Sequence, residues 1–447
     1  MSSPHISRRQ LLSGIGNAAF LSVFGRMNAL AQTTPPDYKA LVCVFLAGGS
    51  DGHNTIVPLT QSELNAYKAA RRSLALPDGN GALLTVQTPD GTPFGFNPGL
   101  QALYPLWGQG RLAVLANTGM LVQPVTRTEF LTNAVPLPTN LFSHSDQIQQ
   151  MQSGIPSTSG GTGWGGRAAD VMQPLNGTSS FPATVSISGP ALFCNGQVIQ
   201  SASLFPGFNL DVDGMNLWPQ AATDARKAGM QQVLQFDSGL ALVQAANHVR
   251  QDALALNGLL TGTSATINTA FPGTTLGNQL LQVAKIIKLR STTGMSRQVF
   301  FCSLGGFDTH GSQSWQHWDL LRQVAEALAA FYNATAEMGI ADRVTSFTLS
   351  DFGRTLQPSG TGTDHGWGSH HLIVGGSVIG GRMYGTFPSM ALGGPDDSGT
   401  RGALIPTTST DQYGGTLAAW LGVPAAQLAS VFPNIAKFGS PTLDFMG

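Results

Sequence analysis

The chain has 447 residues and a formal net charge of −1, and only 11% of its residues are charged, against roughly a quarter in an average soluble domain. Near-zero net charge without a basic run excludes nucleic acid as an expected partner, because phosphate binding needs a cationic patch. Hydrophobic residues make up 42% of the chain, which is enough to bury a large core and excludes a mainly disordered protein.

Residues 1–31 have the features of an export signal. Ser7-Arg8-Arg9-Gln10-Leu11-Leu12 resembles the twin-arginine motif, and an apolar stretch interrupted by glycines leads to the small residues Ala29-Leu30-Ala31. This stretch is too short and too interrupted to span a membrane. We expect the twin-arginine translocase to export the chain and cleavage to occur before Gln32. The mature chain, which contains no other candidate membrane span, should then be periplasmic or secreted.

Four short apolar runs predict strands that are buried on both faces, and each run ends in glycine or polar residues. They cover residues 40–46, 111–115, 299–304 and 344–349. Helical patterns lie between or after them, at 240–260, 276–289, 319–338 and 411–421. This alternation predicts an α/β fold with a mainly parallel sheet flanked by helices on both faces. Ligands bind such sheets beyond the carboxyl ends of the strands.

The segment 174–237 has a different pattern, with short β-like runs, many Gly, Pro and Asn residues, and no clear helix. We interpret it as an inserted, loop-rich β cap within one domain that spans 32–447. The cysteines Cys43, Cys194 and Cys302 form an odd set without CxxC spacing. They therefore predict no disulfide framework, and the apolar runs around Cys43 and Cys302 predict that these two are unreactive buried thiols.

Histidines gather in the polar segments, several of them within two residues of an aspartate. The pairs are Asp51 with His53, His144 with Asp146, Asp308 with His310, and Asp364 with His365. Imidazole together with carboxylate suits zinc, manganese or iron, and carboxylate-rich sets suit calcium or magnesium. One such pair is weak evidence, because aspartate often only caps a helix or forms a turn. Four pairs, two of them directly after predicted strands, predict a metal site or a polar catalytic site.

An ordered set of motifs makes the resemblance to a known family specific. The motifs are GGSDGHN at 48–54, LFSHSDQ at 141–147, GWGGR at 163–167, GFDTH at 306–310, LSDFGRT at 349–355 and GTDHG at 362–366. Over nearly the whole mature chain they resemble the bacterial family called domain of unknown function 1501. That family is similar in fold and motif order to the alkaline phosphatase and sulfatase superfamily, which implies an alkaline-phosphatase-like fold.

The resemblance also implies a set of site residues. It makes Asp51, Asp308, His310, Asp351 and His365 the ligands of one or two divalent metal ions, whether zinc, manganese, calcium or magnesium. Phe352 departs from the superfamily pattern, because it stands where a histidine ligand is expected. A second metal would then be absent or completed by His53, His144 or Asn54.

The remaining catalytic candidates lie around the expected nucleophile. Ser143 precedes a helix-like segment and resembles the nucleophile in position, with His144 beside it and Ser145 as a reserve. Arg354 or Arg167 would grip the oxygens of the substrate through paired hydrogen bonds, unless each only pairs with a structural carboxylate. Two further residues, Trp164 and Trp367, would stack on a sugar ring or pin a loop.

Three hypotheses follow. The first is an exported metal-dependent hydrolase of phosphate or sulfate esters, whose substrate is a small molecule or a glycan ester. The second is a secreted binding or assembly protein that has the same fold without the chemistry. The third is a metal-free serine hydrolase that uses Ser143, which the lack of a G-x-S-x-G motif disfavours.

Overall fold

The computed structural model describes residues 37–447 except 80, 158–160, 180, 207–216, 248–249, 252–253 and 255–265. The predicted export signal at 1–31 lies outside the described residues. Nine strands form the central sheet. In order across the sheet they are β13 (Arg382–Tyr384), β5 (Leu112–Gly119), β12 (Ser369–Gly375), β9 (Val344–Ser350), β1 (Lys39–Leu46), β8 (Arg297–Leu304), β6 (Thr184–Ser186) and β7 (Ala202–Ser203), with β14 (Thr408–Ser409) paired to β5.

The four strands predicted from apolar runs are confirmed as β1, β5, β8 and β9. β1 pairs in parallel with β8 on one side and β9 on the other, and Val42 lies opposite both Phe300 and Ser346. β12 was not predicted and runs antiparallel between β9 and β5. The sheet is therefore mainly parallel, with one antiparallel strand near its middle.

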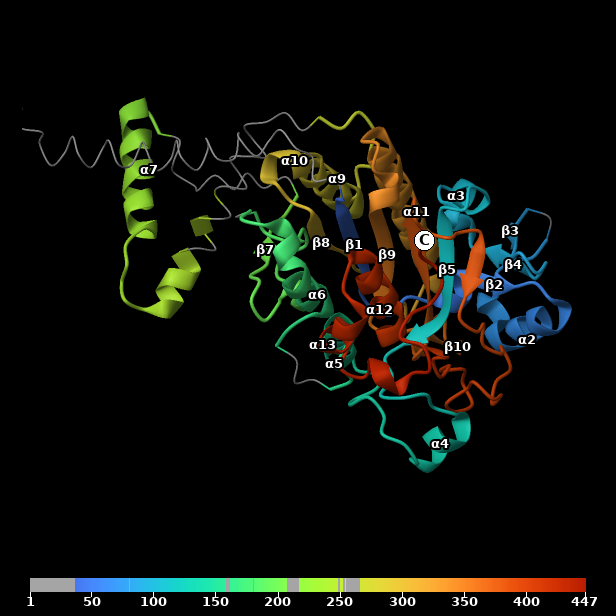
Figure 1. The fold of residues 1–447 in the computed structure, drawn as a ribbon. Coiled ribbons are helices and arrows are strands. Elements are labelled where there is room, and N and C mark those ends of the chain that lie inside the picture. Colours follow the sequence, from blue (N-terminus) through green and yellow to red (C-terminus); the bar gives the residue numbers. More distant parts are fainter. Residues whose placement is uncertain are drawn as a thin grey trace, which may run out of the picture.

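Helices cover both faces of the sheet, as predicted: α6 and α12 lie on one face, and α9 and α11 on the other (Figure 1). The predicted helices at 276–289, 319–338 and 411–421 are α9, α11 and α12, whereas much of 240–260 lies outside the described residues. The α-helices are α2 (Gln61–Arg71), α3 (Tyr104–Gly108), α4 (Arg127–Thr132), α5 (His144–Ser153), α6 (Trp164–Met172), α7 (Gln220–Leu234), α9 (Thr275–Lys288), α10 (Arg290–Thr293), α11 (Gln313–Glu337), α12 (Thr410–Leu421) and α13 (Leu428–Val431).

Smaller elements complete the chain. A three-stranded sheet contains β2 (Ile56–Pro58), β4 (Pro93–Phe96) and β3 (Leu84–Gln87), and a hairpin contains β10 (Arg354–Ser359) and β11 (Gly362–His365). The short 3-10 helices are η1 (Gly52–Asn54), η2 (Arg72–Leu74), η3 (Pro98–Leu100), η4 (Gln173–Asn176), η5 (Leu192–Cys194), η6 (Ala341–Arg343), η7 (Ala425–Gln427) and η8 (Ile435–Lys437).

The segment 174–237, expected to form a β cap without a helix, differs from that expectation in two respects. β6 and β7 extend the edge of the central sheet beyond β8. A helix, α7, forms where none was predicted, and it stands away from the sheet (Figure 1). Among its residues only Thr223 and Leu234 are buried, so α7 lacks the apolar stripe by which a helix is recognised in a sequence.

The carboxyl ends of β1, β8 and β9 lie at one edge of the sheet because these strands are parallel, and β12 begins at the same edge because it is antiparallel. The loops packed there leave no room for side chains at two glycines. A Cβ on Gly48, whose φ is +118°, would lie 2.3 Å from the backbone nitrogen of Asp308, and one on Gly353 would lie 2.0 Å from the carbonyl oxygen of Gly368. This close packing brings loops that are distant in sequence into one site.

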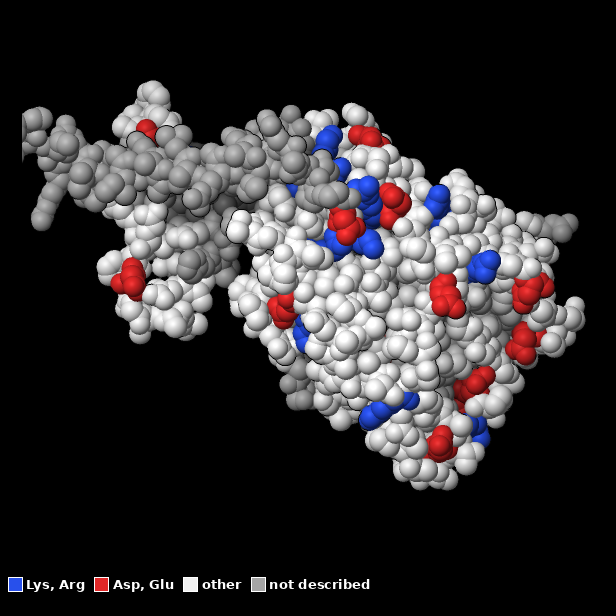
Figure 2. Space-filling view, viewed as in Figure 1, with Lys and Arg blue, Asp and Glu red and all other residues white. Residues whose placement is uncertain are grey.

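Outside the site, the structure agrees with the composition. Cys43, Cys194 and Cys302 are buried and free, and burial raises the pKa of each thiol, which favours the unreactive thiol form. The face in Figure 2 is mostly uncharged, with scattered acidic and basic residues. Within the described part of the chain, no helix is long and apolar enough to cross a membrane.

Candidate functional site

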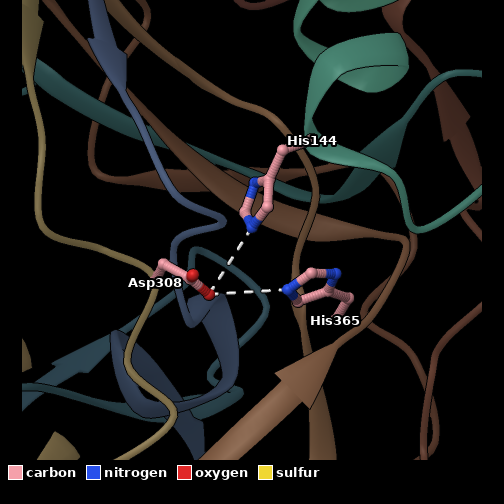
Figure 3. A group of neighbouring side chains, drawn as sticks. All are labelled: His144, Asp308 and His365. Atoms are coloured by element: carbon pink, nitrogen blue, oxygen red, sulfur yellow. Dashed lines mark ion pairs between the residues drawn. The ribbon is translucent and has the colours of Figure 1, made fainter.

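Three side chains from separate parts of the chain meet at the carboxyl edge of the sheet (Figure 3). His144 is the first residue of α5, Asp308 lies in the loop after β8, and His365 ends β11. One ligand atom from each lies within 4.8 Å of the other two. The Nε2 atoms of His144 and His365 are each 3.5 Å from Oδ1 of Asp308.

His310 lies beside these three residues. Its Nε2 atom is 3.0 Å from Oδ1 of Asp308 and 3.1 Å from Nε2 of His365. About half of the His310 side chain is exposed, and so is about half of the Asp308 side chain. The four residues, His144, Asp308, His310 and His365, are called the His–Asp cluster below, and solvent reaches it from the side of Asp308 and His310.

The other ring nitrogen of each histidine has an outer partner. Nδ1 of His144 is 2.7 Å from Oδ2 of Asp351, Nδ1 of His365 is 2.7 Å from the carbonyl oxygen of Phe142, and Nδ1 of His310 is 3.4 Å from Oδ1 of Asp364.

These outer contacts fix the protonation of the two better-held rings. A carbonyl oxygen only accepts hydrogen bonds, so Nδ1 of His365 carries the proton and Nε2 keeps a lone pair. The Asp351 carboxylate imposes the same tautomer on neutral His144, whose Nε2 atom is buried and has no hydrogen-bond partner among the described residues. Metal-binding histidines are held in this way by carboxylates and carbonyls, so the donor atoms suit a cation.

Burial and neighbouring charges shift the pKa values of the cluster residues in different directions. The hydrogen bond to Asp351 raises the pKa of His144, and burial lowers the pKa of His365. Burial acts to raise the pKa of Asp308, but the hydrogen bond and positive charge of Arg354 outweigh it and lower that pKa. Asp308 is therefore ionised at neutral pH and supplies a carboxylate to the cluster.

Arg354 is a fully buried side chain that holds Asp308 in place. Its Nη1 donates to Oδ1 of Asp308 at 2.7 Å and to the carbonyl oxygen of Gly48 at 3.1 Å, and its Nε donates to Oγ1 of Thr363 at 3.2 Å. Its Nη2 donates to the Thr363 carbonyl oxygen. With its donors engaged by the protein, Arg354 fits a positioning role and not the predicted grip on substrate.

Arg167 also has its donors engaged by the protein and does not face the His–Asp cluster in any described contact. It is buried and donates to the backbone carbonyl oxygens of Ser153, Thr162 and Val431. The two tryptophans proposed to stack on a sugar are also buried, and Nε1 of Trp367 donates to the carbonyl oxygen of Met120 at 2.9 Å. Burial favours the alternative in which these residues pin loops.

Asp51 and Asp351 do not join the cluster as direct members. Asp51 is fully buried, its carboxylate paired with Arg71 and bonded by the side chain of Gln313. Its Oδ1 also accepts the backbone N–H of Asn54 at 3.1 Å, which caps η1. Asp351 accepts the N–H of Gly48 at 3.0 Å and holds His144. The structure thus places Asp51 in an internal ion pair and Asp351 behind a cluster histidine.

The serines next to His144 have other partners. Oγ of Ser143 donates to Oδ2 of Asp146 at 2.5 Å and lies 3.1 Å from Oγ of Ser145. Neither serine hydroxyl bonds to a histidine among the described residues, so the histidine base of a serine-hydrolase triad is not in place beside Ser143. The ring of Phe352 lies 4.7 Å, centroid to centroid, from both His144 and His365, and forms an apolar wall of the site.

Sequence reasoning paired Asp364 with a different histidine from the one it contacts, and it did not find the Phe142 carbonyl. Asp364 had a signal, because it directly precedes His365, but its contact is with His310. The Phe142 carbonyl had none, since any residue supplies one. His144 was expected as a catalytic residue or a reserve ligand, and the structure places it in the middle of the cluster.

The family comparison bears on the whole region. A model described as "Protein of unknown function (DUF1501)" matches residues 38–401. The chain belongs to the DUF1501 family. The matched range contains every residue of the His–Asp cluster and its outer partners, so the site lies within the part of this DUF1501 protein that its family shares. A comparison with curated proteins gives no match.

Solved structures with partial similarity to this DUF1501 chain include three enzymes. The lipoteichoic acid synthase LtaP from Listeria monocytogenes has 8% identity and a TM-score of 0.33, with 90% of this chain and 78% of that chain covered. A sulfatase from Pseudoalteromonas sp. has 10% identity and a TM-score of 0.34, with 94% and 74% covered. The phosphonate monoester hydrolase of Agrobacterium radiobacter has 10% identity and a TM-score of 0.33, with 85% and 73% covered. Similarity this low carries no argument about the reaction.

Proposed function

We propose that this protein is an exported, metal-dependent hydrolase of phosphate or sulfate esters, with the metal ion held by His144, Asp308 and His365. The supporting observation is the convergence of three ligand atoms from three loops within 4.8 Å. Export rests on the twin-arginine motif of residues 1–31. Hydrolysis is one of the reactions that a metal ion can catalyse in a cluster that solvent reaches from one side.

The spacing of the donor atoms suits a transition metal. Metal–ligand bonds of about 2.0–2.1 Å in a tetrahedral site separate neighbouring ligand atoms by about 3.3 Å. The separations within the His–Asp cluster range from 3.0 to 3.5 Å where they involve Asp308. The imidazole donors favour zinc over calcium or magnesium, and the Asp308 carboxylate is also compatible with manganese. His310 would be a fourth ligand or would face the substrate.

The chain's own residues position the ligands and shape the site. Arg354 fixes Asp308, Asp351 fixes the tautomer of His144, and Phe352 covers one side of both partly exposed imidazoles. A divalent ion bound here would supply charge neutralisation for the ester oxygens and a lower pKa for an attacking water. Water fits the role of nucleophile better than Ser143, whose hydroxyl is bonded to the Asp146 carboxylate and to no cluster residue.

The test is hydrolysis before and after metal removal. We expect the purified mature protein to hydrolyse an aryl phosphate or aryl sulfate, and dialysis against a chelator to lower the rate at least about 100-fold. Zinc or manganese should restore the rate. Hydrolysis that is unchanged in fully metal-free protein would contradict the proposal.

A second function, binding without catalysis, is favoured by one observation. Arg354 has its donors engaged, and Phe352 occupies one side of the cluster. A binding protein of this kind would retain a glycan or protein ligand on a column while turning over no ester. The serine hydrolase alternative lacks such support, because Ser143 is bonded to Asp146.

Replacing the outer carboxylate of His144 tests the assigned geometry. We expect Asp351→Asn to weaken metal binding by a factor of about 10–100, because an amide no longer imposes one tautomer on His144. The measurement is a competition titration with a chromogenic chelator. The exposed Asp342→Asn change is the matched control and should bind metal as the wild type does. Equal affinity in Asp351→Asn would exclude the proposed role of Asp351.

A further inference from the structure

A chain of contacts leads from the His–Asp cluster to the surface and ends at an arginine. Oδ1 of Asp364 is 3.4 Å from Nδ1 of His310, and Oδ2 of the same carboxylate is 2.8 Å from Nη1 of Arg401. His310 in turn contacts Asp308 at 3.0 Å. Arg401 is thus joined to the centre of the site through one carboxylate and one imidazole.

The backbone around Arg401 is held firmly against the hairpin that carries His365. The carbonyl oxygen of Arg401 accepts the N–H of Gln357 at 3.0 Å, and that of Gly402 accepts the N–H of Leu356 at 3.0 Å. Both Gln357 and Leu356 belong to β10. The carboxylate of Asp397 also accepts the N–H groups of Gly393, Gly399 and Gly402 and closes the loop. These bonds fix the backbone of Arg401 relative to the hairpin that carries His365.

The guanidinium of Arg401 has N–H donors that make no hydrogen bond to the described part of the protein. About half of its side chain, 48%, is exposed. Nη1 faces Asp364, and Nε lies 3.4 Å from the side-chain oxygen of Gln357. Its Nη2 makes no hydrogen bond to another described residue. Arg354, by contrast, is fully buried, and its nitrogens donate to protein groups.

An ester of phosphoric or sulfuric acid brings negative charge that a site must neutralise. We propose that Arg401 binds the anionic group of the substrate at the rim of the His–Asp cluster, a role that rests on the proposed function. The ligand class is a tetrahedral oxyanion carried by an ester, since the planar fork of arginine matches two oxygens of such a group. Asp364 holds the guanidinium toward the cluster. It contacts only Nη1, so Nη2 can still donate to an oxyanion.

The first experiment measures anion binding directly. Isothermal titration of inorganic phosphate and inorganic sulfate is carried out on the purified, metal-loaded mature protein and on Arg401→Gln, Arg401→Lys and Arg382→Gln. Arg382 is an exposed residue on β13 and serves as the matched control. Loss of a charge-assisted hydrogen-bond pair predicts affinity about 10–100-fold lower in Arg401→Gln. Lysine should recover part of the loss, because it keeps the charge and loses the fork.

The second experiment separates charge recognition from general damage. The KM of Arg401→Gln for an aryl phosphate or sulfate should rise about 10–100-fold, while its metal content stays unchanged and Arg382→Gln keeps the wild-type KM. Wild-type affinity for both anions in Arg401→Gln, or no anion binding by the wild type, overturns the assignment of Arg401. Absence of metal and turnover in the wild type would instead overturn the proposed function, so the two failures are distinct.

Discussion

Asp308→Asn is expected to remove the bound metal and to lower ester hydrolysis by a factor of about 100–1,000. Asp308 supplies the carboxylate of the cluster, and its Oδ1 lies 3.0–3.5 Å from the Nε2 atoms of three histidines. Asparagine keeps the shape and removes the charge, so both metal affinity and catalysis should fall together. Metal content by elemental analysis and kcat/KM with an aryl ester are the measurements.

The control for this variant is the exposed Asp342→Asn, which removes the same charge far from any cluster contact. Far-UV circular dichroism and urea unfolding must show that Asp308→Asn is folded, because the change leaves buried Arg354 without its carboxylate partner. A folded Asp308→Asn protein with full metal content would rule out Asp308 as a ligand.

Asp51→Asn is expected to act on stability instead of metal binding. The variant leaves the buried guanidinium of Arg71 without its charge partner, and breaking a buried ion pair costs about 3–5 kcal/mol. Urea unfolding at neutral pH measures this loss. Metal bound per folded chain should equal that of the wild type. Loss of metal from a folded Asp51→Asn protein would restore Asp51 as a ligand and contradict the internal ion pair as its role.

The same ion pair predicts a dependence on pH. Burial acts to raise the pKa of Asp51, but the charges of Arg71, His317 and His53 outweigh it and lower the pKa from 3.8 to about 2. Because the folded-state pKa is the lower one, the contribution is complete above about pH 4 and is lost as the pH falls toward 2. Asp51→Asn should therefore lose less stability than the wild type between these pH values. An identical loss in both proteins would contradict the assignment.

Much of the fold could be predicted from local sequence pattern. β1 and β8 contain continuous apolar runs because both faces of the sheet are covered, and such runs reveal buried strands. β12 was missed because its residues, Ser369 to Gly375, include two adjacent histidines, His370 and His371, that are buried by tertiary packing. α7 was missed because it buries little.

Only part of the site could be predicted from the sequence, because long-range contacts decide which side chains meet there. Asp51, Asp308 and Asp351 each follow a parallel strand, so sequence placed all three at the same edge. Which of these aspartates reaches the cluster depends on ion pairs with arginines from distant parts of the chain. Asp51 pairs with Arg71 on α2 and lies away from the cluster, whereas Asp308 pairs with Arg354 on β10, which holds it in the cluster. No local pattern records such pairings.

The most direct test of this account is the metal content of the mature protein, purified after export without chelators and compared with His365→Ala. We expect about one zinc or manganese ion per wild-type chain, and close to none in folded His365→Ala. A wild-type protein that contains no transition metal, and binds none on titration with zinc and manganese, would contradict a metal site at the His–Asp cluster.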